Sequence, residues 1–279
     1  MILIADSGST KTDWRLVNSD KQIQSFQTIG FNPYYIAKQQ MLEELSKSAL
    51  ADNKISVTHV YFYGAGCSSF AKSSEIKQTL NSFFSNAEIE VSHDLLAAAR
   101  ALCREQAGLV AILGTGSNSC FFDGRTIVKN VSSLGFILGD EGSGAHLGKT
   151  FIQTLLNKEI SLDIQLKFDE KFNLTLPDIL DAVYKKPLPN RFLAQFVPFI
   201  LENKSNNQIN DIIHSCFQSF FTKHVCKYEN YQQYPLHIVG SVGYVFKTEL
   251  EKVANSNRVE LGKIIKQPVD ELVKYHLGN

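Results

Sequence analysis

Paired cysteines are missing from this sequence. Its five cysteines are scattered and form no CxxC pair: Cys67, Cys103, Cys120, Cys216 and Cys226. Zinc and iron–sulfur sites need paired spacings, and an odd, scattered set does not suit a disulfide framework. We therefore expect reduced, mostly buried thiols in a cytoplasmic protein.

Charge excess and long apolar runs are absent as well. The 279 residues include 28 basic and 28 acidic side chains, so the formal net charge is zero. Nucleic-acid affinity comes largely from neutralising phosphates, so we expect no nucleic-acid partner. The apolar run at residues 196–201 is far shorter than the roughly 20 residues of a membrane span. The apolar N-terminus reaches Asp6 without a basic leader, so we expect no signal peptide. Since no apolar run is long enough for a span, we expect no membrane partner.

The first third of the chain alternates strand and helix patterns. Apolar and alternating runs predict strands at 2–6, 14–17, 22–29, 58–63 and 88–92, and helical spacing predicts helices at 34–50 and 95–102. This order predicts an α/β fold with an antiparallel start. No Pro/Gly-rich linker divides the chain, so we expect two lobes with a cleft rather than separate beads.

The opening of the chain is repeated at an offset of 108 residues. Residues 2–10 and 110–118 each run from an apolar strand into a Gly/Ser/Thr turn, and a second strand follows. Ile4 matches Ile112 and Gly8 matches Gly116. The repeat predicts a duplicated domain.

The second half is more helical. Apolar residues at 209, 212, 213, 216, 217 and 220 follow the helical period and predict a core-facing helix. An apolar helix is predicted from about residue 145, and a strand at 235–239 leads through the turn 240–243 into a helix ending near 254.

Three Gly/Ser/Thr turns follow strands, at residues 6–12, 114–118 and 240–243. Small residues let backbone N–H groups approach an anion, so three such turns favour phosphate binding over ordinary hairpin turns. None has the P-loop or dinucleotide-fold spacing. Lys11 is either a phosphate contact or an exposed turn lysine, and Asp6 is either a magnesium ligand or a turn stabiliser.

Two further carboxylates have both a structural and a chemical interpretation. Asp94 follows the strand 88–92 and opens a helix, which suits an N-cap or a general base at a strand end. Asp140 lies among glycines in the segment 139–144 before a helix. It either complements the helix dipole or accepts hydrogen bonds from sugar hydroxyls.

Four motifs together resemble a known family. The segments 6–13 (DSGSTKTD), 114–118 (GTGSN), 138–143 (LGDEGS) and 239–242 (VGSV) occur in the order seen in the BadF/BadG/BcrA/BcrD ATPase family, and the chain looks most similar to its N-acetylglucosamine kinases. The resemblance covers nearly the whole chain. It implies an actin/hexokinase/Hsp70-type fold: two ribonuclease-H-like lobes with a central cleft for ATP and substrate.

The resemblance also implies site residues and domain bounds. The ATP-binding residues would be Gly8, Ser9, Thr10, Lys11, Thr115, Gly116, Ser117, Asn118, Gly240 and Ser241. The sugar would contact Asn32, Asp94, Thr115 and Asp140, with Asp94 as the catalytic residue and Asp6 near Mg²⁺. The lobes would be residues 1–107, joined by a returning helix at 267–279, and residues 108–266.

Two departures from the family pattern stand out. Ser7 replaces a usual glycine, which is tolerable if its φ is negative. Ser132, Ser133 and Leu134 stand where the kinases commonly have Gly-Gly-Trp, which bears on recognition of the sugar's 2-substituent.

The resemblance therefore predicts an ATP-dependent kinase of an amino sugar, with N-acetylglucosamine converted to its 6-phosphate as the specific expectation. A homodimer is the oligomer that we consider. The first alternative is an ATPase activator of a 2-hydroxyacyl-CoA dehydratase or benzoyl-CoA reductase, for which no iron–sulfur cysteine motif is seen. The second is a non-catalytic sugar or nucleotide sensor on the same fold, against which the presence of both Asp94 and Asp140 argues.

Overall fold

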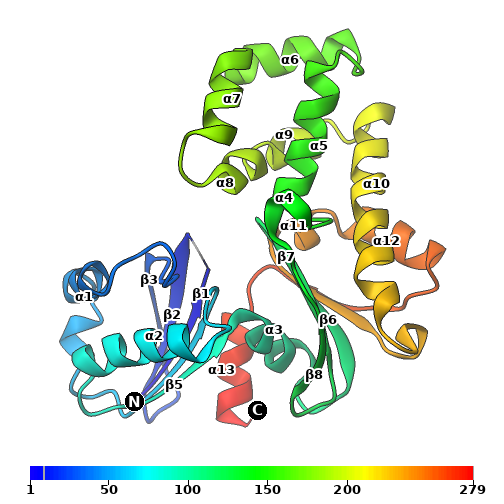
Figure 1. Ribbon diagram of the computed structural model, residues 1–279. Helices are drawn as coiled ribbons and strands as arrows, with labels where there is room; N and C mark the ends of the chain where they lie inside the picture. Colours follow the sequence, from blue (N-terminus) through cyan, green and yellow to red (C-terminus); the bar gives the residue numbers. More distant parts are fainter. Residues whose placement is uncertain (9, 279) are drawn as a thin grey trace. The chain divides into compact units, whose positions relative to one another are not determined.

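Two mixed β-sheets organise the chain (Figure 1). The computed structural model describes residues 1–8 and 10–278. Its contacts divide it into unit 1, Met1–Glu105 with Gln267–Asn279, and unit 2, Gln106–Lys266. Each unit contains one five-stranded sheet and the helices that pack on it.

Unit 1 begins with an antiparallel hairpin and continues with parallel strands. Its main elements are β1 (Ile2–Ser7), β2 (Lys11–Val17), β3 (Ile23–Ile29), α1 (Lys38–Lys47), β4 (His59–Gly64), α2 (Phe70–Phe83), β5 (Glu88–His93), α3 (Asp94–Cys103) and α13 (Val269–Leu277). The strand order is β3-β2-β1-β4-β5, with β4 and β5 parallel to β1.

Alternate residues of β1 face opposite layers, as the period of a strand requires. Leu3 and Ala5 join a core that includes Met41 of α1 and Leu80 of α2. Ile4 belongs to a second core that includes residues of α3 and α13. The sheet is therefore covered by α1 and α2 on one face and by α3 and the returning α13 on the other.

Unit 2 repeats this plan and adds helices. Its strands are β6 (Gly108–Leu113), β7 (Ser117–Phe122), β8 (Ile127–Val131), β9 (Leu236–Val239) and β10 (Leu261–Ile265). Its helices are α4 (Gly135–Leu138), α5 (Gly144–Leu156), α6 (Leu162–Phe172), α7 (Leu176–Tyr184), α8 (Pro189–Ala194), α9 (Val197–Glu202), α10 (Asn207–Lys223), α11 (Ser241–Val245) and α12 (Lys247–Ser256).

The sheet of unit 2 has the same topology as that of unit 1. Its order, β8-β7-β6-β9-β10, again places the first strand of the unit at the centre, between an antiparallel pair and a parallel pair. This match confirms the predicted α/β class, and it agrees with the duplication inferred from the repeat.

The core of unit 2 confirms the helical pattern found in the sequence. All six residues of the predicted apolar face of α10 are buried. Asn206 caps this helix, because its side chain accepts hydrogen bonds from the backbone N–H groups of Gln208 and Ile209. Each fully buried apolar side chain in such a core contributes about 1.5–3 kcal/mol.

Several predicted boundaries differ from the structure, among them the start of the strand predicted at 14–17, which is β2 and begins at Lys11. The helix expected at 34–50 is only α1, because the residues after Asn32 form turns and Ala37 is extended. The helix expected up to residue 254 is divided at Phe246 into α11 and α12. Asp94 is the first residue of α3, and the N-cap is His93.

Candidate active site

The C-terminal ends of three parallel strands meet at one edge of the unit 1 sheet. Ser7 of β1 lies beside Gly64 of β4, which lies beside His93 of β5. Because neighbouring strands are about 4.8 Å apart, the ends of β1 and β5 are roughly 10 Å apart. This register brings Asp6 and Asp94, which are 88 residues apart in sequence, to the same edge.

Asp6 is a partly buried carboxylate near the end of β1. Burial raises its pKa to about 7; the negative charges of Asp94 and Asp13 act in the same direction, and Lys11 opposes them. A carboxylate that is costly to ionise alone gains from a nearby cation. Mg²⁺ typically takes one or two protein carboxylates and completes its shell with phosphates and water, so Asp6 fits that ion. Among residues 1–8 and 10–278, no group of three His, Cys, Asp or Glu side chains forms a metal cluster.

Asp94 begins α3 directly after β5. Its Oδ1 accepts a hydrogen bond from the backbone N–H of Leu95 at 2.8 Å. The predicted capping role falls instead to His93, whose Nδ1 accepts from the Leu96 N–H at 3.3 Å. Burial raises the pKa of Asp94, although His93 and the Leu95 N–H oppose the shift. A carboxylate with a raised pKa is a better general base.

The first turn lies between β1 and β2. The Gly8 N–H donates to the Lys11 carbonyl at 2.9 Å, and the Lys11 ammonium pairs with Asp13 at 2.7 Å. Thr10 is exposed, and its carbonyl accepts the Gly30 N–H at 3.0 Å. Ser9, predicted to contact ATP, lies outside the described residues.

Ser7, which replaces the usual glycine, sits in β1 and is not among the residues with positive φ. The condition set for its tolerance is therefore met. Its hydroxyl accepts the Phe31 N–H at 2.9 Å and shares a hydrogen bond with the Thr12 hydroxyl at 2.8 Å. These bonds tie the segment that carries Asn32 to the end of β1.

Asn32 is buried in a turn after β3. Its Oδ1 accepts the Tyr34 N–H at 3.0 Å. Gly66, with φ of +84°, approaches so closely that a Cβ there would lie 2.5 Å from this Oδ1. The structure therefore fixes the Asn32 amide beside the turn that follows β4, and its contact with sugar stays a prediction.

The second turn, between β6 and β7, is bound to the start of α5. The Gly144 N–H donates to the Gly114 carbonyl at 2.8 Å, and the Ala145 N–H donates to the Thr115 carbonyl at 3.0 Å. The Ser117 hydroxyl is buried and has no hydrogen-bond partner among the described residues. A buried hydroxyl without a partner at a glycine turn, with open space where a Gly114 side chain would be, fits a site for phosphate oxygens.

Asn118 in β7 makes hydrogen bonds within the sheet of unit 2. Its Oδ1 accepts hydrogen bonds from the Ser119 N–H and the Asn130 amide, both at 2.9 Å. The predicted role of Asn118 toward ATP would fall to its remaining amide donors.

Asp140 lies in direct contact with the second turn. It is buried, has φ of +55°, and accepts a hydrogen bond from the Ser133 hydroxyl at 2.7 Å. A Cβ at Gly116 would lie 2.9 Å from Asp140 Oδ2, so a side chain there would displace the carboxylate. The structure thus brings together two predicted site residues, Gly116 and Asp140, from segments about two dozen residues apart.

The residue after Asp140 anchors the loop to the end of α10. Glu141 accepts hydrogen bonds from Lys223 Nζ at 2.8 Å and from His224 Nε2 at 3.0 Å. Burial disfavours the Glu141 charge, but these two donors outweigh it and lower its pKa to about 2. The neighbouring Gly142 N–H donates to His146 Nδ1 at 3.1 Å. Burial lowers the pKa of His146 to about 4, so this imidazole is neutral and can accept.

The third turn touches the second. Gly240 has φ of +130°, and a Cβ there would lie 3.1 Å from the Gly114 nitrogen and closer still to the Leu113 carbonyl. Ser241 is exposed and begins α11. The predicted ATP and sugar residues of unit 2 therefore gather at one end of its sheet.

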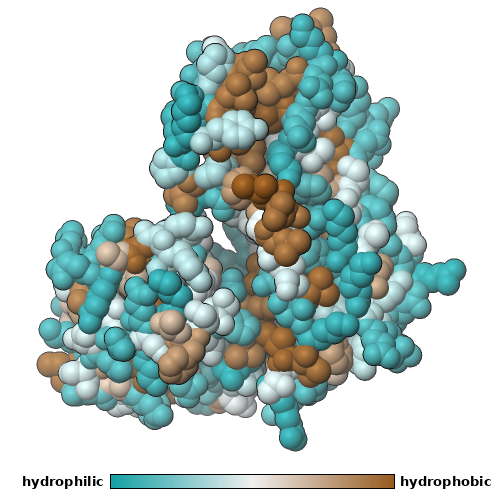
Figure 2. Space-filling view, viewed as in Figure 1, coloured by the Kyte–Doolittle hydropathy of each residue, from teal (hydrophilic) through white to brown (hydrophobic). Residues whose placement is uncertain are grey.

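An exposed apolar patch precedes Asp140. Leu134, Ile137 and Leu138 are 62%, 71% and 74% exposed, and Figure 2 shows hydrophobic surface at the position of α4. Leu134, which stands where the kinases commonly have tryptophan, packs its Cβ against Gly139. The segment that departs from the pattern of the kinases thus lies close in sequence to Asp140, the carboxylate predicted to bind the sugar.

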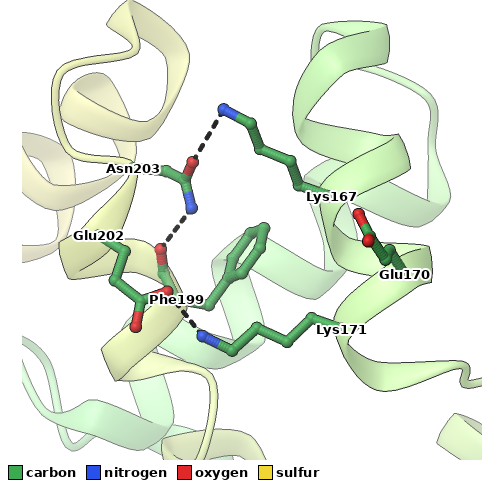
Figure 3. A pocket seen from close by; sticks show the side chains of 6 residues that line it. All are labelled: Lys167, Glu170, Lys171, Phe199, Glu202 and Asn203. Atoms are coloured by element: carbon green, nitrogen blue, oxygen red, sulfur yellow. Dashed lines mark hydrogen bonds and ion pairs between the residues drawn. The ribbon is translucent and has the colours of Figure 1, made fainter.

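A hollow of about 480 Å³ lies elsewhere in unit 2, between α6 and α9 (Figure 3). The Lys171 ammonium pairs with Glu202 at 2.6 Å, and Lys167 reaches the Asn203 amide oxygen at 3.5 Å. None of the predicted site residues lines this hollow. We assign it no part in the chemistry of the turns.

Comparison with known proteins places the chain in a family. The profile of the BadF/BadG/BcrA/BcrD ATPase family matches residues 5–219. The chain belongs to this family. A comparison with curated proteins finds no match.

Solved structures agree with the fold. A candidate N-acetylglucosamine kinase from Porphyromonas gingivalis is 42% identical, with a TM-score of 0.95 over 100% of this chain and 99% of that one. A candidate N-acetylglucosamine kinase from Chromobacterium violaceum is 16% identical, with a TM-score of 0.69 over 100% and 98%. A ROK family glucokinase from Streptomyces griseus, solved with glucose and AMPPNP, is 11% identical, with a TM-score of 0.58 over 98% and 97%.

The protein therefore has the two-lobed α/β fold of actin-like ATPases and ROK sugar kinases. In the part of the chain that the structure describes, no helix is both long and apolar enough to cross a membrane.

Proposed function

We propose that this protein is an ATP-dependent sugar kinase that phosphorylates N-acetylglucosamine on its 6-hydroxyl. The observation that carries the proposal is the full-length likeness, at 42% identity, to the candidate N-acetylglucosamine kinase of Porphyromonas gingivalis. The strand ends of unit 1 support it, because they carry a carboxylate suited to a general base, Asp94, and a carboxylate suited to Mg²⁺, Asp6.

In this proposal Asp94 accepts the proton of the attacking sugar hydroxyl. The raised pKa of Asp94 brings it closer to the working pH, where a general base is most effective. Asn32 and Asp140 hold sugar hydroxyls, and Thr115 contributes at the second turn. These side chains fix the orientation of the acceptor, which supplies much of the rate in phosphoryl transfer.

The first two turns hold the phosphates of ATP through Gly8, Thr10, Lys11 and the residues Thr115, Gly116, Ser117 and Asn118. Gly240 and Ser241 contact the adenosine. Mg²⁺, when bound near Asp6, neutralises charge on the phosphates. The buried Ser117 hydroxyl has no hydrogen-bond partner among the described residues, as expected of a group that binds a ligand.

A sugar panel tests the proposal. ADP release is measured with ATP, Mg²⁺ and each of N-acetylglucosamine, glucosamine, N-acetylmannosamine, N-acetylmuramic acid and glucose, and the product is identified by mass and by NMR. We expect N-acetylglucosamine to give the highest kcat/KM and a 6-phosphate. Asp140→Ala should lower kcat/KM severely for every sugar, because a binding site that loses a carboxylate hydrogen bond loses its hold on the hydroxyl. Glucose as the best substrate by a wide margin, or full activity in excess chelator, would contradict the proposal.

The two alternatives give different results in the same preparation. An activating ATPase would carry iron when purified without oxygen. A sensor would bind sugar or nucleotide without releasing ADP. Iron analysis and the ADP assay therefore separate all three functions.

A further inference from the structure

Asp13 is an acid of the first motif that the proposed function leaves without a role. It lies in β2 directly opposite Asp6 of β1 and beside Gln27 of β3. Residues directly opposite each other on neighbouring strands point to the same face, so Asp6 and Asp13 form a pair of like charges. Such a pair costs stability, and packing alone gives no reason for an acid at this position.

The Asp13 side chain is buried, and both of its carboxylate oxygens accept hydrogen bonds. The residue is 7% exposed. Its Oδ2 accepts hydrogen bonds from Lys11 Nζ at 2.7 Å and from Gln267 Nε2 at 3.1 Å, and its Oδ1 accepts from Gln27 Nε2 at 2.9 Å. Two of these donors are neutral amides. They hold the carboxylate in place, and among the described residues Lys11 is the one cation paired with it.

The Lys11 side chain remains 43% exposed despite this ion pair. An ammonium has three N–H donors, and the bond to Asp13 takes one of them. The ammonium is therefore held in place at the first turn with donors left to meet an anion. A lysine side chain without a partner loses conformational entropy when it binds phosphate. An ion pair that already orders the side chain removes much of this entropic cost of binding.

We propose that Asp13 is a positioning residue that acts through Lys11, holding its ammonium ready for the phosphates of ATP at the first turn. This inference rests on the proposed function only in assigning Lys11 to phosphate. Gln27 and Gln267 orient the Asp13 carboxylate, and neither contributes charge.

A double-mutant cycle tests whether Asp13 acts through Lys11. Asp13→Asn keeps the size and one acceptor oxygen of the side chain but removes its charge, and Lys11→Met removes the ammonium. We expect K11M to lower kcat/KM for ATP by roughly 100-fold, in line with the loss of one charged donor to a transferring phosphoryl group. D13N should lower it by roughly 10-fold in the wild-type background and by less than about twofold in the K11M background. KM for the sugar should stay within about twofold in every variant.

Gln27→Ala is the matched control. It removes one hydrogen bond from the same carboxylate but leaves the ion pair with Lys11, so kcat/KM for ATP should fall less than about threefold. If D13N lowers kcat/KM equally in the wild-type and K11M backgrounds, or if Q27A acts as strongly as D13N, Asp13 has a structural role and the inference is wrong. Should D13N not fold, Asp13→Ser, which is smaller and uncharged but still accepts hydrogen bonds, replaces it in the cycle.

Calorimetric binding of MgATP without sugar separates this inference from the proposed function. The same non-additivity in ATP affinity, found in a protein that phosphorylates none of the sugars, would support the positioning role while overturning the kinase assignment. An additive cycle in a protein that phosphorylates N-acetylglucosamine would do the reverse.

Discussion

Ser133 donates a hydrogen bond through its hydroxyl to Asp140 Oδ1 at 2.7 Å. The bond closes the segment that contains α4 and holds a carboxylate whose backbone has a positive φ. The other carboxylate oxygen, Oδ2, lies over Gly116. Ser133 thus fixes the orientation of Asp140.

Ser133→Ala is therefore expected to weaken sugar binding. Without the hydroxyl, Asp140 can rotate, and part of the sugar's binding energy goes into ordering it again. We expect KM for the sugar to rise by about 3- to 10-fold, with kcat and KM for ATP changed by less than about twofold. Ser133→Thr keeps the hydroxyl and serves as the control. Equal KM values for S133A and wild type would show that Asp140 is held without Ser133.

The positions of these pairs explain what sequence could and could not predict. The repeat of strand and turn at Ile4 and Ile112 predicted two related halves, and the shared sheet order agrees with it. The apolar face of α10 could be predicted because its apolar residues keep the helical spacing over about three turns. In contrast, α2 has only three buried residues and an exposed Phe70, so no clear stripe marks it.

Contacts that depend on register or on short helices were missed. Asp13 faces Asp6 only because the hairpin pairs Ser7 with Thr12, and the strand predicted from residue 14 did not include Asp13. The Ser133–Asp140 bond spans α4, whose four residues are too few to show a period. Residue preference left Asp94 as either the N-cap of α3 or a general base, and the structure gives the cap to His93.

Asp94→Asn is expected to abolish phosphoryl transfer with little effect on folding. Asparagine keeps an oxygen that can accept the Leu95 N–H, and His93 still caps the helix, but the amide cannot take a proton. Loss of a general base typically lowers kcat by about 10²- to 10⁴-fold. MgATP affinity should match wild type, and the melting temperature should be no lower than that of wild type, because burial already raises the pKa of Asp94. Turnover near the wild-type value would remove Asp94 from the mechanism.

Asp6→Asn is expected to stabilise the metal-free protein at neutral and alkaline pH. Burial raises the pKa of Asp6 from 3.8 to about 7 in the folded state. The folded protein therefore holds this proton more tightly than the unfolded chain, and the resulting stability is lost as pH rises from about 4 through about 7. Asparagine mimics the protonated acid at every pH. In the presence of chelator, the melting temperature of D6N minus that of wild type should grow across this range. At pH values above 7 we expect this difference to be a few degrees Celsius.

Two further measurements sharpen this test. Mg²⁺ with ATP should raise the melting temperature of wild type more than that of D6N, because only wild type offers an anionic ligand. Asp20→Asn, at an exposed acid of the loop between β2 and β3, should leave the pH dependence of melting unchanged. A constant difference between D6N and wild type from pH 4 to pH 8 would mean that Asp6 titrates normally.

Glu141→Gln is expected to loosen the loop that carries Asp140. The mutation replaces a buried anion, held by Lys223 and His224, with a neutral amide. We expect a loss of about 2 kcal/mol in the free energy of unfolding at pH 7 and a several-fold rise in KM for the sugar. Lys223→Met is the control: Lys223 is 62% exposed, and His224 still donates to Glu141, so the loss should be smaller.

The pH dependence identifies the charge of Glu141 as the cause. Its pKa is about 2 in the fold against an ordinary value of 4.5. The unfolded chain therefore takes up this proton first, and the stability that the charge supplies is full above about pH 5 and is lost as pH falls toward 2. Urea unfolding of wild type and E141Q should thus give free energies that differ most at pH 7 and converge near pH 2. A difference that stays constant over this range would assign the effect to packing rather than to charge.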